Sequence, residues 1–225
     1  MCYHVSLNKD IKVVEKEFGK KVDAPELFQT GYHLNGFAQP YLPVLSTQDA
    51  TSISMYRWKL LPHWLKSESD WKANTLNAKG EELFEKGAYK TYWQNRCLVI
   101  CNGFFEPHHP SGQKKAQSYY VKPKAGGFFT LGAVYSVWKD IPTFSIITVA
   151  ASPLLEEIHN EKKRMPLILD GDRADAWLLP DLSKTEMAGL MTPYPEDDRL
   201  EGFRVMDGVT NSRIDTNIPE VLEAL

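Results

Sequence analysis

The chain has 225 residues, a formal net charge of −3 and 43% hydrophobic residues, which is the composition of an ordinary globular protein and gives no sign of nucleic-acid binding. A chain of this length can bury a core without covalent staples, and an odd count of three cysteines argues against a secreted disulfide framework. The sequence has no apolar run near 18 residues and no apolar segment after its first residues. We therefore expect no transmembrane helix, no signal peptide and a reducing cytosolic compartment.

The charges are unevenly distributed along the chain. Residues 57–139 carry 13 Lys and Arg against 6 Asp and Glu, and the remainder carries 13 against 23. A basic middle with acidic flanks indicates either a local anion-binding face or a solvated surface with uneven charge.

The first predicted element is a short helix over KDIKVVEKEF, with Asn8 as its N-cap and Gly19 just past its end. Residues 31–61 are irregular and then strand-like, because YLPVLS and SISMYRWKLLP combine β-branched and aromatic residues with proline. A polar loop then leads into a predicted helix around EELFEKGAYKTYW, and Asn77 stands where an N-cap would stand.

The middle of the chain is rich in predicted strands. RCLVICNGFFE is an apolar run of the buried-strand type, SYYVKPKAGGFFTLGAVYSVW is typical of two strands around a turn, and TFSIITVAA is another strand. A short helix follows over SPLLEEIH, with Ser152 as N-cap and Pro153 in its first position.

The last third mixes both kinds of element. MPLILD and FRVMDGV are predicted strands, and DRADAWLL and SKTEMAGLM are predicted helices. Strands outnumber helices without regular βαβ alternation, and no linker separates two parts. The pattern predicts one α+β domain over residues 1–225, built of short helices around a mainly antiparallel, barrel-like sheet.

Two residues of this pattern could move protons. Glu106 closes the run LVICNGFFE, so it is either a carboxylate with a raised pKa at a cleft or the first exposed residue after the strand. His159 follows SPLLEEI at a helix end, where a histidine either interacts with the helix dipole or acts as a general acid or base. Arg164 follows as a phosphate or carboxylate partner, or as a surface arginine.

Cys2 is the third candidate. Removal of Met1 would give this residue a free α-amine beside its thiol, and an α-amine has a pKa of about 7.7–8.0. Such an amine attacks an aldehyde to form a Schiff base, and the thiol then closes a five-membered thiazolidine ring. The residue type therefore favours covalent chemistry with carbonyl compounds.

Other cysteines, histidines and aromatic residues give weaker signals. Cys97 and Cys101 lack the spacing of a zinc ribbon, and we expect both to be buried and inert. A metal site could combine Cys2 and His4 with the pair His108-His109, but this spacing is not diagnostic. The aromatic residues that lie among lysines suit either stacking on unpaired bases or core packing. They are Tyr56, Trp58, Trp64, Trp71, Tyr92 and Trp93.

Five stretches in this order resemble the SOS response-associated peptidase family. They are Met1-Cys2, WKLLPHW (58–64), NAKGE (77–81), CNGFFE (101–106) and HNEKKRMP (159–166), and the tail VTNS (209–212) resembles the closing strand of that family. The resemblance implies a single α+β domain around a barrel-like sheet. It also implies a cytosolic or nucleoid protein that loses Met1, by self-processing or by an aminopeptidase. Such a protein crosslinks itself to abasic sites in single-stranded DNA through a thiazolidine that shields the lesion.

The resemblance assigns roles to individual residues. Cys2 would be the nucleophile, Asn77 would orient the N-terminal residue and the sugar, Glu106 would shuttle protons, and His159 would help ring opening and reversal, which is lyase-like chemistry. The expected DNA contacts are Trp64, Lys79, Arg164 and His4. We expect a monomer with no cofactor, no metal ion and no membrane association.

This sequence departs from the family pattern at four positions. Tyr3 and His4 stand where many members have Gly and Arg, so bulk is gained beside Cys2 and a permanent charge is lost. Lys79 stands where many members have Arg, and Pro107 replaces the usual Trp. The catalytic set is retained, and we expect DNA affinity and the handling of flanking nucleotides to differ.

Two other classes of function remain open at this point. The same residues could serve an N-terminal-cysteine peptidase or amidohydrolase that acts on peptides without DNA, which would need an oxyanion hole. The chain could also be a non-catalytic DNA- or metal-binding module with reversible, salt-sensitive binding.

Overall fold

The computed structural model describes residues 2–209 and 216–225 of the chain. Five strands close into a barrel in the order β4, β3, β6, β9, β10, because β10 pairs with both β9 and β4. The pairing of β10 with β4 is parallel, and the other barrel pairings are antiparallel. The barrel strands are β3 (Tyr41–Ser46), β4 (Ser54–Trp58), β6 (Arg96–Cys101), β9 (Phe129–Trp138) and β10 (Ile141–Ala150).

Two short strands extend the barrel along β10. β5 (Asn77–Lys79) pairs with it in parallel, and β11 (Arg164–Pro166) pairs with it in the antiparallel sense. Both strands carry residues that the sequence places in the candidate site, so β10 fixes their spacing.

A second sheet is antiparallel throughout and has the order β12, β8, β7, β1, β2. Its strands are β1 (His4–Leu7), β2 (Gly31–Asn35), β7 (Gly103–His108), β8 (Gln117–Pro123) and β12 (Leu200–Val205). Only Asn102 separates β6 from β7, so the apolar run RCLVICNGFFE passes from the barrel directly into the second sheet. This passage carries Glu106 to the place where the two sheets meet.

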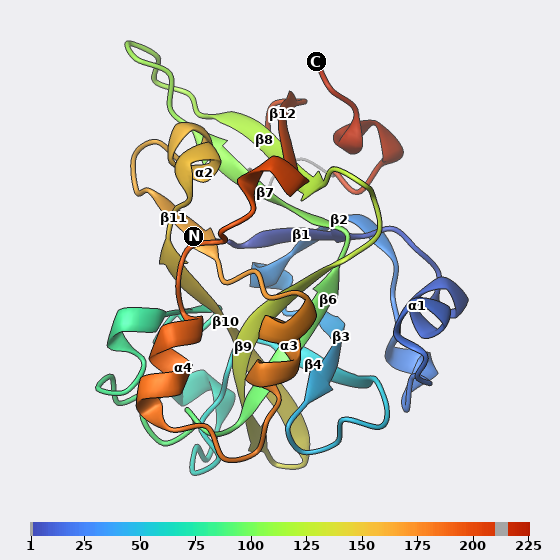
Figure 1. Ribbon diagram of the computed structural model, residues 1–225, viewed down its shortest axis with the longest axis vertical. Helices are drawn as coiled ribbons and strands as arrows, with labels where there is room; N and C mark the ends of the chain where they lie inside the picture. Colours follow the sequence, from blue (N-terminus) through green and yellow to red (C-terminus); the bar gives the residue numbers. More distant parts are fainter. Residues whose placement is uncertain (1, 210–215) are drawn as a thin grey trace.

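In the described part of the chain, four short α-helices surround the sheets: α1 (Ile11–Phe18), α2 (Pro153–Ile158), α3 (Gly171–Trp177) and α4 (Lys184–Leu190). In Figure 1, α1 lies on the right, and α2, β11 and the N-terminal end lie on the left. The remaining helical turns are 3-10 turns: η1 (Pro25–Leu27), η2 (Gly36–Ala38), η3 (Glu68–Asp70), η4 (Gly80–Glu82), η5 (Asp197–Arg199) and η6 (Pro219–Leu222). No helix among the described residues is long and apolar enough to cross a membrane.

The predicted fold class is confirmed: the chain is a single-domain α+β protein with a closed five-stranded barrel, an antiparallel sheet and few short helices. The first helix begins at Ile11 rather than earlier, because the side chain of Asp10, not Asn8, accepts hydrogen bonds from the first turn. Apart from Val209, the VTNS segment lies outside the described residues.

The helix predicted around EELFEKGAYKTYW is wrong. The segment forms the 3-10 turn η4 and further turns, and Gly87 lies in its middle. Tyr89 and Tyr92 are buried and bind other segments: Tyr89 donates to the Asn77 carbonyl at 2.8 Å, and the Tyr92 hydroxyl accepts from the His63 amide at 3.0 Å. These contacts override helix propensity. The prediction that Asn77 caps a helix is also wrong, because Asn77 lies in β5.

Candidate active site around Cys2

Cys2 lies two residues before the start of β1 and is fully buried. β1 runs antiparallel to β7 with His4 opposite Phe105, so the residues just before His4 lie alongside Glu106. Burial raises the pKa of the Cys2 thiol well above its ordinary value, and the negative charge of Glu106 raises it further. The thiol is therefore held in its protonated form beside a carboxyl group.

Glu106 lies within β7, where its side chain is completely buried. Burial raises the pKa of this carboxyl to about 7, since the surrounding apolar strands disfavour the charged form. His159 Nδ1 lies 3.3 Å from Glu106 Oε2. A carboxyl with a pKa near neutrality can both donate and accept a proton at cellular pH, as acid–base catalysis requires.

His159 is the C-cap of α2 and is 2% exposed. Its Nδ1 lies 2.9 Å from the carbonyl oxygen of Arg164. A carbonyl oxygen only accepts, so we assign the proton to Nδ1 and the lone pair to Nε2. Burial lowers the pKa of His159 to about 4, which keeps the imidazole neutral at cellular pH.

The end of α2 is fastened to the end of β7 by four hydrogen bonds. His108 Nδ1 donates to the carbonyls of Glu157 at 3.0 Å and Ile158 at 3.2 Å. The Asn160 side chain accepts from the His109 amide at 2.9 Å and donates to the His109 carbonyl at 2.7 Å. These contacts hold the neighbours of His159 against the neighbours of Glu106. Sequence reasoning missed Asn160, for which only its place directly after His159 gave a signal.

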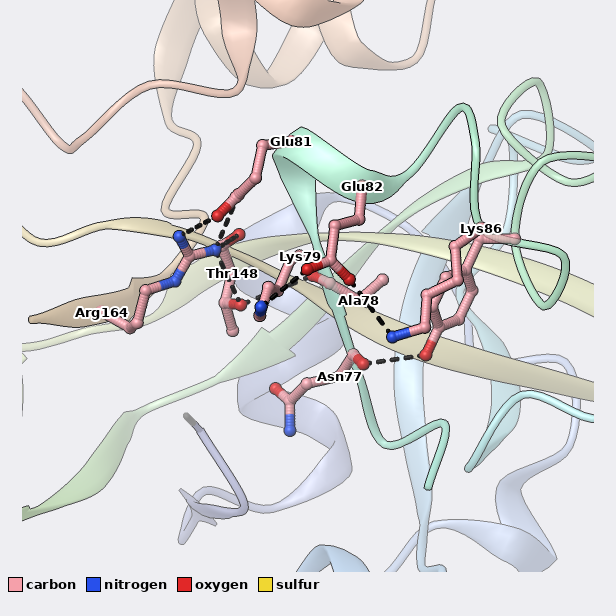
Figure 2. A network of polar contacts seen from close by, with 9 residues as sticks. Asn77, Ala78, Lys79, Glu81, Glu82, Lys86, Thr148 and Arg164 are labelled. Atoms are coloured by element: carbon pink, nitrogen blue, oxygen red, sulfur yellow. Dashed lines mark hydrogen bonds and ion pairs between the residues drawn. The ribbon is translucent and has the colours of Figure 1, made fainter. Parts of the chain in front are cut away.

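Asn77 lies on β5, one of the strands that extend the barrel along β10. Both polar atoms of its side-chain amide are shielded from solvent and have no hydrogen-bond partner among the described residues. Figure 2 shows that this amide points away from the charged network around it. Leaving such a group unpaired costs about 1–3 kcal/mol, so its position calls for a reason other than stability.

The charged network beside Asn77 contains two of the predicted DNA contacts (Figure 2). Arg164 forms a bidentate ion pair with Glu81, with N–O distances of 2.5 and 2.9 Å. Its guanidinium also donates a hydrogen bond to the Thr148 carbonyl at 2.6 Å. Lys79 pairs with Glu82 at 2.7 Å. The side chain of Lys79 is half-exposed, whereas that of Arg164 is mostly covered.

The other two predicted DNA contacts lie in opposite surroundings. Trp64 is 60% exposed and meets Trp71 edge to face, with 5.9 Å between the ring centres. His4 is buried, its Nδ1 lies 2.8 Å from Nε2 of His33, and burial lowers its pKa to about 3. Because His4 is buried and neutral, it cannot contact a phosphate, and it lies outside the proposed DNA interface.

The remaining cysteines and histidines form no metal-binding group among the described residues, where no cluster of three or more His, Cys, Asp or Glu side chains occurs. Cys97 and Cys101 are buried, and burial raises the pKa of both thiols, that of Cys101 to about 12. The structure thus brings Cys2, Glu106 and His159 together, with Asn77 reaching the region from the neighbouring barrel.

The sequence profile of the family described as SOS response associated peptidase (SRAP) matches residues 1–212. The chain belongs to the SRAP family. It is 27% identical to "Abasic site processing protein YoqW" of Bacillus subtilis over the whole of both chains. It is also 29% identical to "Abasic site processing protein YMR114C" of Saccharomyces cerevisiae, where the match covers 82% of this chain and 50% of the yeast protein.

A crystal structure of a Bacteroides thetaiotaomicron protein has a similar fold. It superposes with a TM-score of 0.88 at 28% identity, and the match covers both chains completely. The family resemblance inferred from the motifs is therefore confirmed.

Proposed function

We propose that this SRAP protein processes abasic sites in single-stranded DNA by forming a thiazolidine crosslink through Cys2 after removal of Met1. One observation carries the proposal: a buried carboxyl with a pKa near 7 and a neutral histidine lie 3.3 Å apart at the strand that flanks the Cys2 thiol. The names of the relatives as abasic site processing proteins support the same substrate.

The chemistry begins with hydrolysis of the peptide bond between Met1 and Cys2, which we assign to the protein itself. The freed α-amine bonds to the aldehyde carbon of the ring-opened sugar while one of its protons passes to the aldehyde oxygen. Glu106 protonates that oxygen again so that it departs as water, and the second amine proton returns to Glu106, which gives a neutral Schiff base. The thiol sulfur then bonds to that carbon while the thiol proton passes through Glu106 to the nitrogen. The complete addition releases one water, and the same groups can reverse it.

The neighbouring residues position the sugar and the DNA strand. The His159 Nε2 lone pair accepts the proton of the sugar hydroxyl when the ring opens, and the Asn77 amide binds the sugar and the N-terminal residue. Trp64 supplies an exposed ring for base stacking. Lys79 and Arg164 contact phosphate after exchange from Glu82 and Glu81.

We also propose a domain organisation, an oligomeric state and a cellular location for the protein. Residues 1–225 act as one SRAP-like domain and as a monomer, because an open channel for single-stranded DNA needs no second copy of the chain. The basic middle of the sequence favours contact with the DNA backbone, and we place the protein in the cytoplasm at the nucleoid.

Denaturing electrophoresis of the protein with abasic single-stranded DNA tests this function. The wild type should form a DNA-bound band that survives denaturation, and Cys2→Ala should abolish it because both the thiol and the ring closure are lost. Cys97→Ala, at another buried cysteine, is the matched control and should crosslink. Equal crosslinking by Cys2→Ala, or peptide hydrolysis without any DNA adduct, would contradict the proposal.

A further inference from the structure

A cavity of about 240 Å³ lies between the turn η2 and the segment that leads into β5. We propose that this cavity binds the base of the nucleotide that flanks the abasic site. The inference rests on the proposed function and adds a specificity pocket to it. The lining of the cavity includes Phe37, Lys59, Trp71, Lys72, Asn74 and Leu76.

The walls of the cavity are connected to the chain neighbours of two residues of the candidate site. One wall is the turn η2, which is joined to Tyr3, the neighbour of Cys2: the Gly36 amide donates to the Tyr3 carbonyl at 2.8 Å. The opposite wall ends at Leu76, the neighbour of Asn77. A sugar held between Cys2 and Asn77 therefore places its adjoining nucleotide at the mouth of this cavity.

Aromatic rings give the cavity an affinity for flat ligands. Phe37 is 58% exposed, and Trp71 lines the same space. The Trp71 indole is fixed by a hydrogen bond to Thr75 Oγ1 at 3.2 Å. Fixed aromatic rings stack on bases of any sequence, and each stacked base contributes about 1–3 kcal/mol.

Charged and polar side chains complete the match to a nucleotide. Lys72 is exposed and makes no ion pair with any described residue, so its ammonium group can meet a phosphate. Lys59 stands 3.5 Å from Glu68 and adds a second positive charge at the rim. Asn74 offers an amide, the side-chain group that can bind base edges.

The backbone of the turn holds Phe37 in its exposed position. Gly36 packs on the buried indole of Trp58, and a Cβ at this position would lie 3.2 Å from the ring. Asn35 Oδ1 accepts from the Phe37 amide at 3.0 Å. The exposed ring is therefore part of an ordered turn.

Tyr3 gives this chain its own version of the pocket. Its ring packs against Phe37 at 5.1 Å between centres, and its hydroxyl shares a hydrogen bond with the Asn74 side chain. Tyr3 thus contacts both walls of the cavity. The family resemblance implies glycine at this position in many members. We infer that Tyr3 sets how tightly the flanking base is held.

Crosslinking rates on defined oligonucleotides test the pocket. Two substrates carry one reactive abasic site, flanked on both sides either by adenines or by unreactive tetrahydrofuran residues that lack bases. At protein concentrations well below saturation, the wild type should crosslink the adenine-flanked substrate about 5–150-fold faster, which corresponds to 1–3 kcal/mol of stacking. Phe37→Ala should reduce this ratio several-fold, and Tyr3→Gly should reduce it less.

The matched control is Leu179→Ala, which removes another exposed apolar side chain, outside the cavity, and should keep the wild-type ratio. Equal rates on the two substrates, or a Phe37→Ala variant with an unchanged ratio, would overturn the pocket while crosslinking itself still stands. No crosslinking of either substrate by the wild type would overturn the proposed function first, and the pocket with it.

Discussion

Two buried titratable residues define the site at the scale of single residues. Burial shifts the pKa of Glu106 upward to about 7 and that of His159 downward to about 4, so both groups favour their neutral forms. At neutral pH the buried Glu106 lowers the stability of the folded chain, because an exposed carboxylate would be charged there, whereas the buried His159 lowers it as the pH falls below about 6.5. The proposed chemistry explains why such costly groups lie beside Cys2.

Glu106→Gln should make stability less sensitive to pH. The folded-state pKa of Glu106 is raised, so its favourable contribution is complete below about pH 4.5 and is lost as the pH rises through 7. Glutamine cannot ionise. The stability of the variant relative to the wild type should rise by on the order of 2 kcal/mol between pH 5 and pH 8, or roughly 4–8 °C in Tm.

Thermal melting at the two pH values measures this difference. Glu157→Gln, which removes an exposed carboxylate from the adjoining helix α2, is the control for loss of a charge and should show a constant difference from the wild type. A constant difference for Glu106→Gln as well would show that Glu106 ionises as an ordinary carboxylate.

Asn77→Ala should separate activity from stability. The Asn77 amide is shielded from solvent and has no hydrogen-bond partner among the described residues, so its removal should not lower the free energy of unfolding and should raise it by up to about 1–3 kcal/mol. Crosslinking should slow at least ~10-fold, because the sugar loses a positioning group.

Asn102→Ala provides the contrast to this variant. The Asn102 side chain accepts from the Asn8 amide at 2.8 Å and donates to the Gly127 carbonyl at 2.7 Å. Its removal should cost about 1–3 kcal/mol and leave the crosslinking rate of the folded protein unchanged. If chemical denaturation shows the larger loss for Asn77→Ala, the amide is a structural group.

At the scale of elements, the site depends on the seam between α2 and β7, which consists of the four hydrogen bonds that join His108 and His109 to Glu157, Ile158 and Asn160. α2 has six residues and cannot be stable by itself, so its end must be placed by contacts with the sheet. The Asn160 side chain provides two of these contacts, both to the backbone of His109. The geometry of His159 thus depends on residues that do not react.

Asn160→Ala should weaken this seam. Loss of both hydrogen bonds should cost about 1–2 kcal/mol and slow crosslinking, because His159 is no longer held at 3.3 Å from Glu106. Asn160→Asp retains the acceptor for the His109 amide and should slow the reaction less.

Single-turnover crosslinking together with urea denaturation measures both effects. Glu161→Gln removes only an exposed contact of 3.5 Å with His109 and is the control. A wild-type crosslinking rate for Asn160→Ala would show that the seam does not position His159.

The sequence predicted many of these elements for clear local reasons. β-branched and aromatic runs located β3, β8, β9 and β10, and Ser152 with Pro153 located the start of α2. β1 and β2 were not predicted, because their short segments carry histidine and polar residues that the second sheet buries. The helix predicted around Tyr89 was wrong for the opposite reason. Its residues favour a helix, but they are held in turns by distant partners such as the Asn77 carbonyl, which accepts a hydrogen bond from Tyr89.

At the scale of the whole molecule, the site lies where the barrel meets the second sheet. β5 and β11 bring Asn77 and Arg164 along β10, whereas β1 and β7 bring Cys2 and Glu106 from the other sheet. No local pattern contains these pairings, so the sequence could predict a barrel-like sheet but not its closure by the parallel pairing of β10 with β4.

The same limit applies to the candidate site. Motif order identified the residues, but their surroundings depend on long-range packing. His4 was expected to contact DNA, and its pairing with His33 on β2 buries it instead. The ion pairs of Lys79 and Arg164 and the unpaired amide of Asn77 were likewise visible only in the folded chain.

Mass spectrometry of the protein after incubation with abasic single-stranded DNA tests the central claim most directly. We expect free protein that lacks Met1, and an adduct whose mass equals that of this protein plus the oligonucleotide less one water. Peptide mapping should place the DNA on Cys2. An adduct mapped to a lysine, or protein that retains Met1 and forms no adduct, would contradict it.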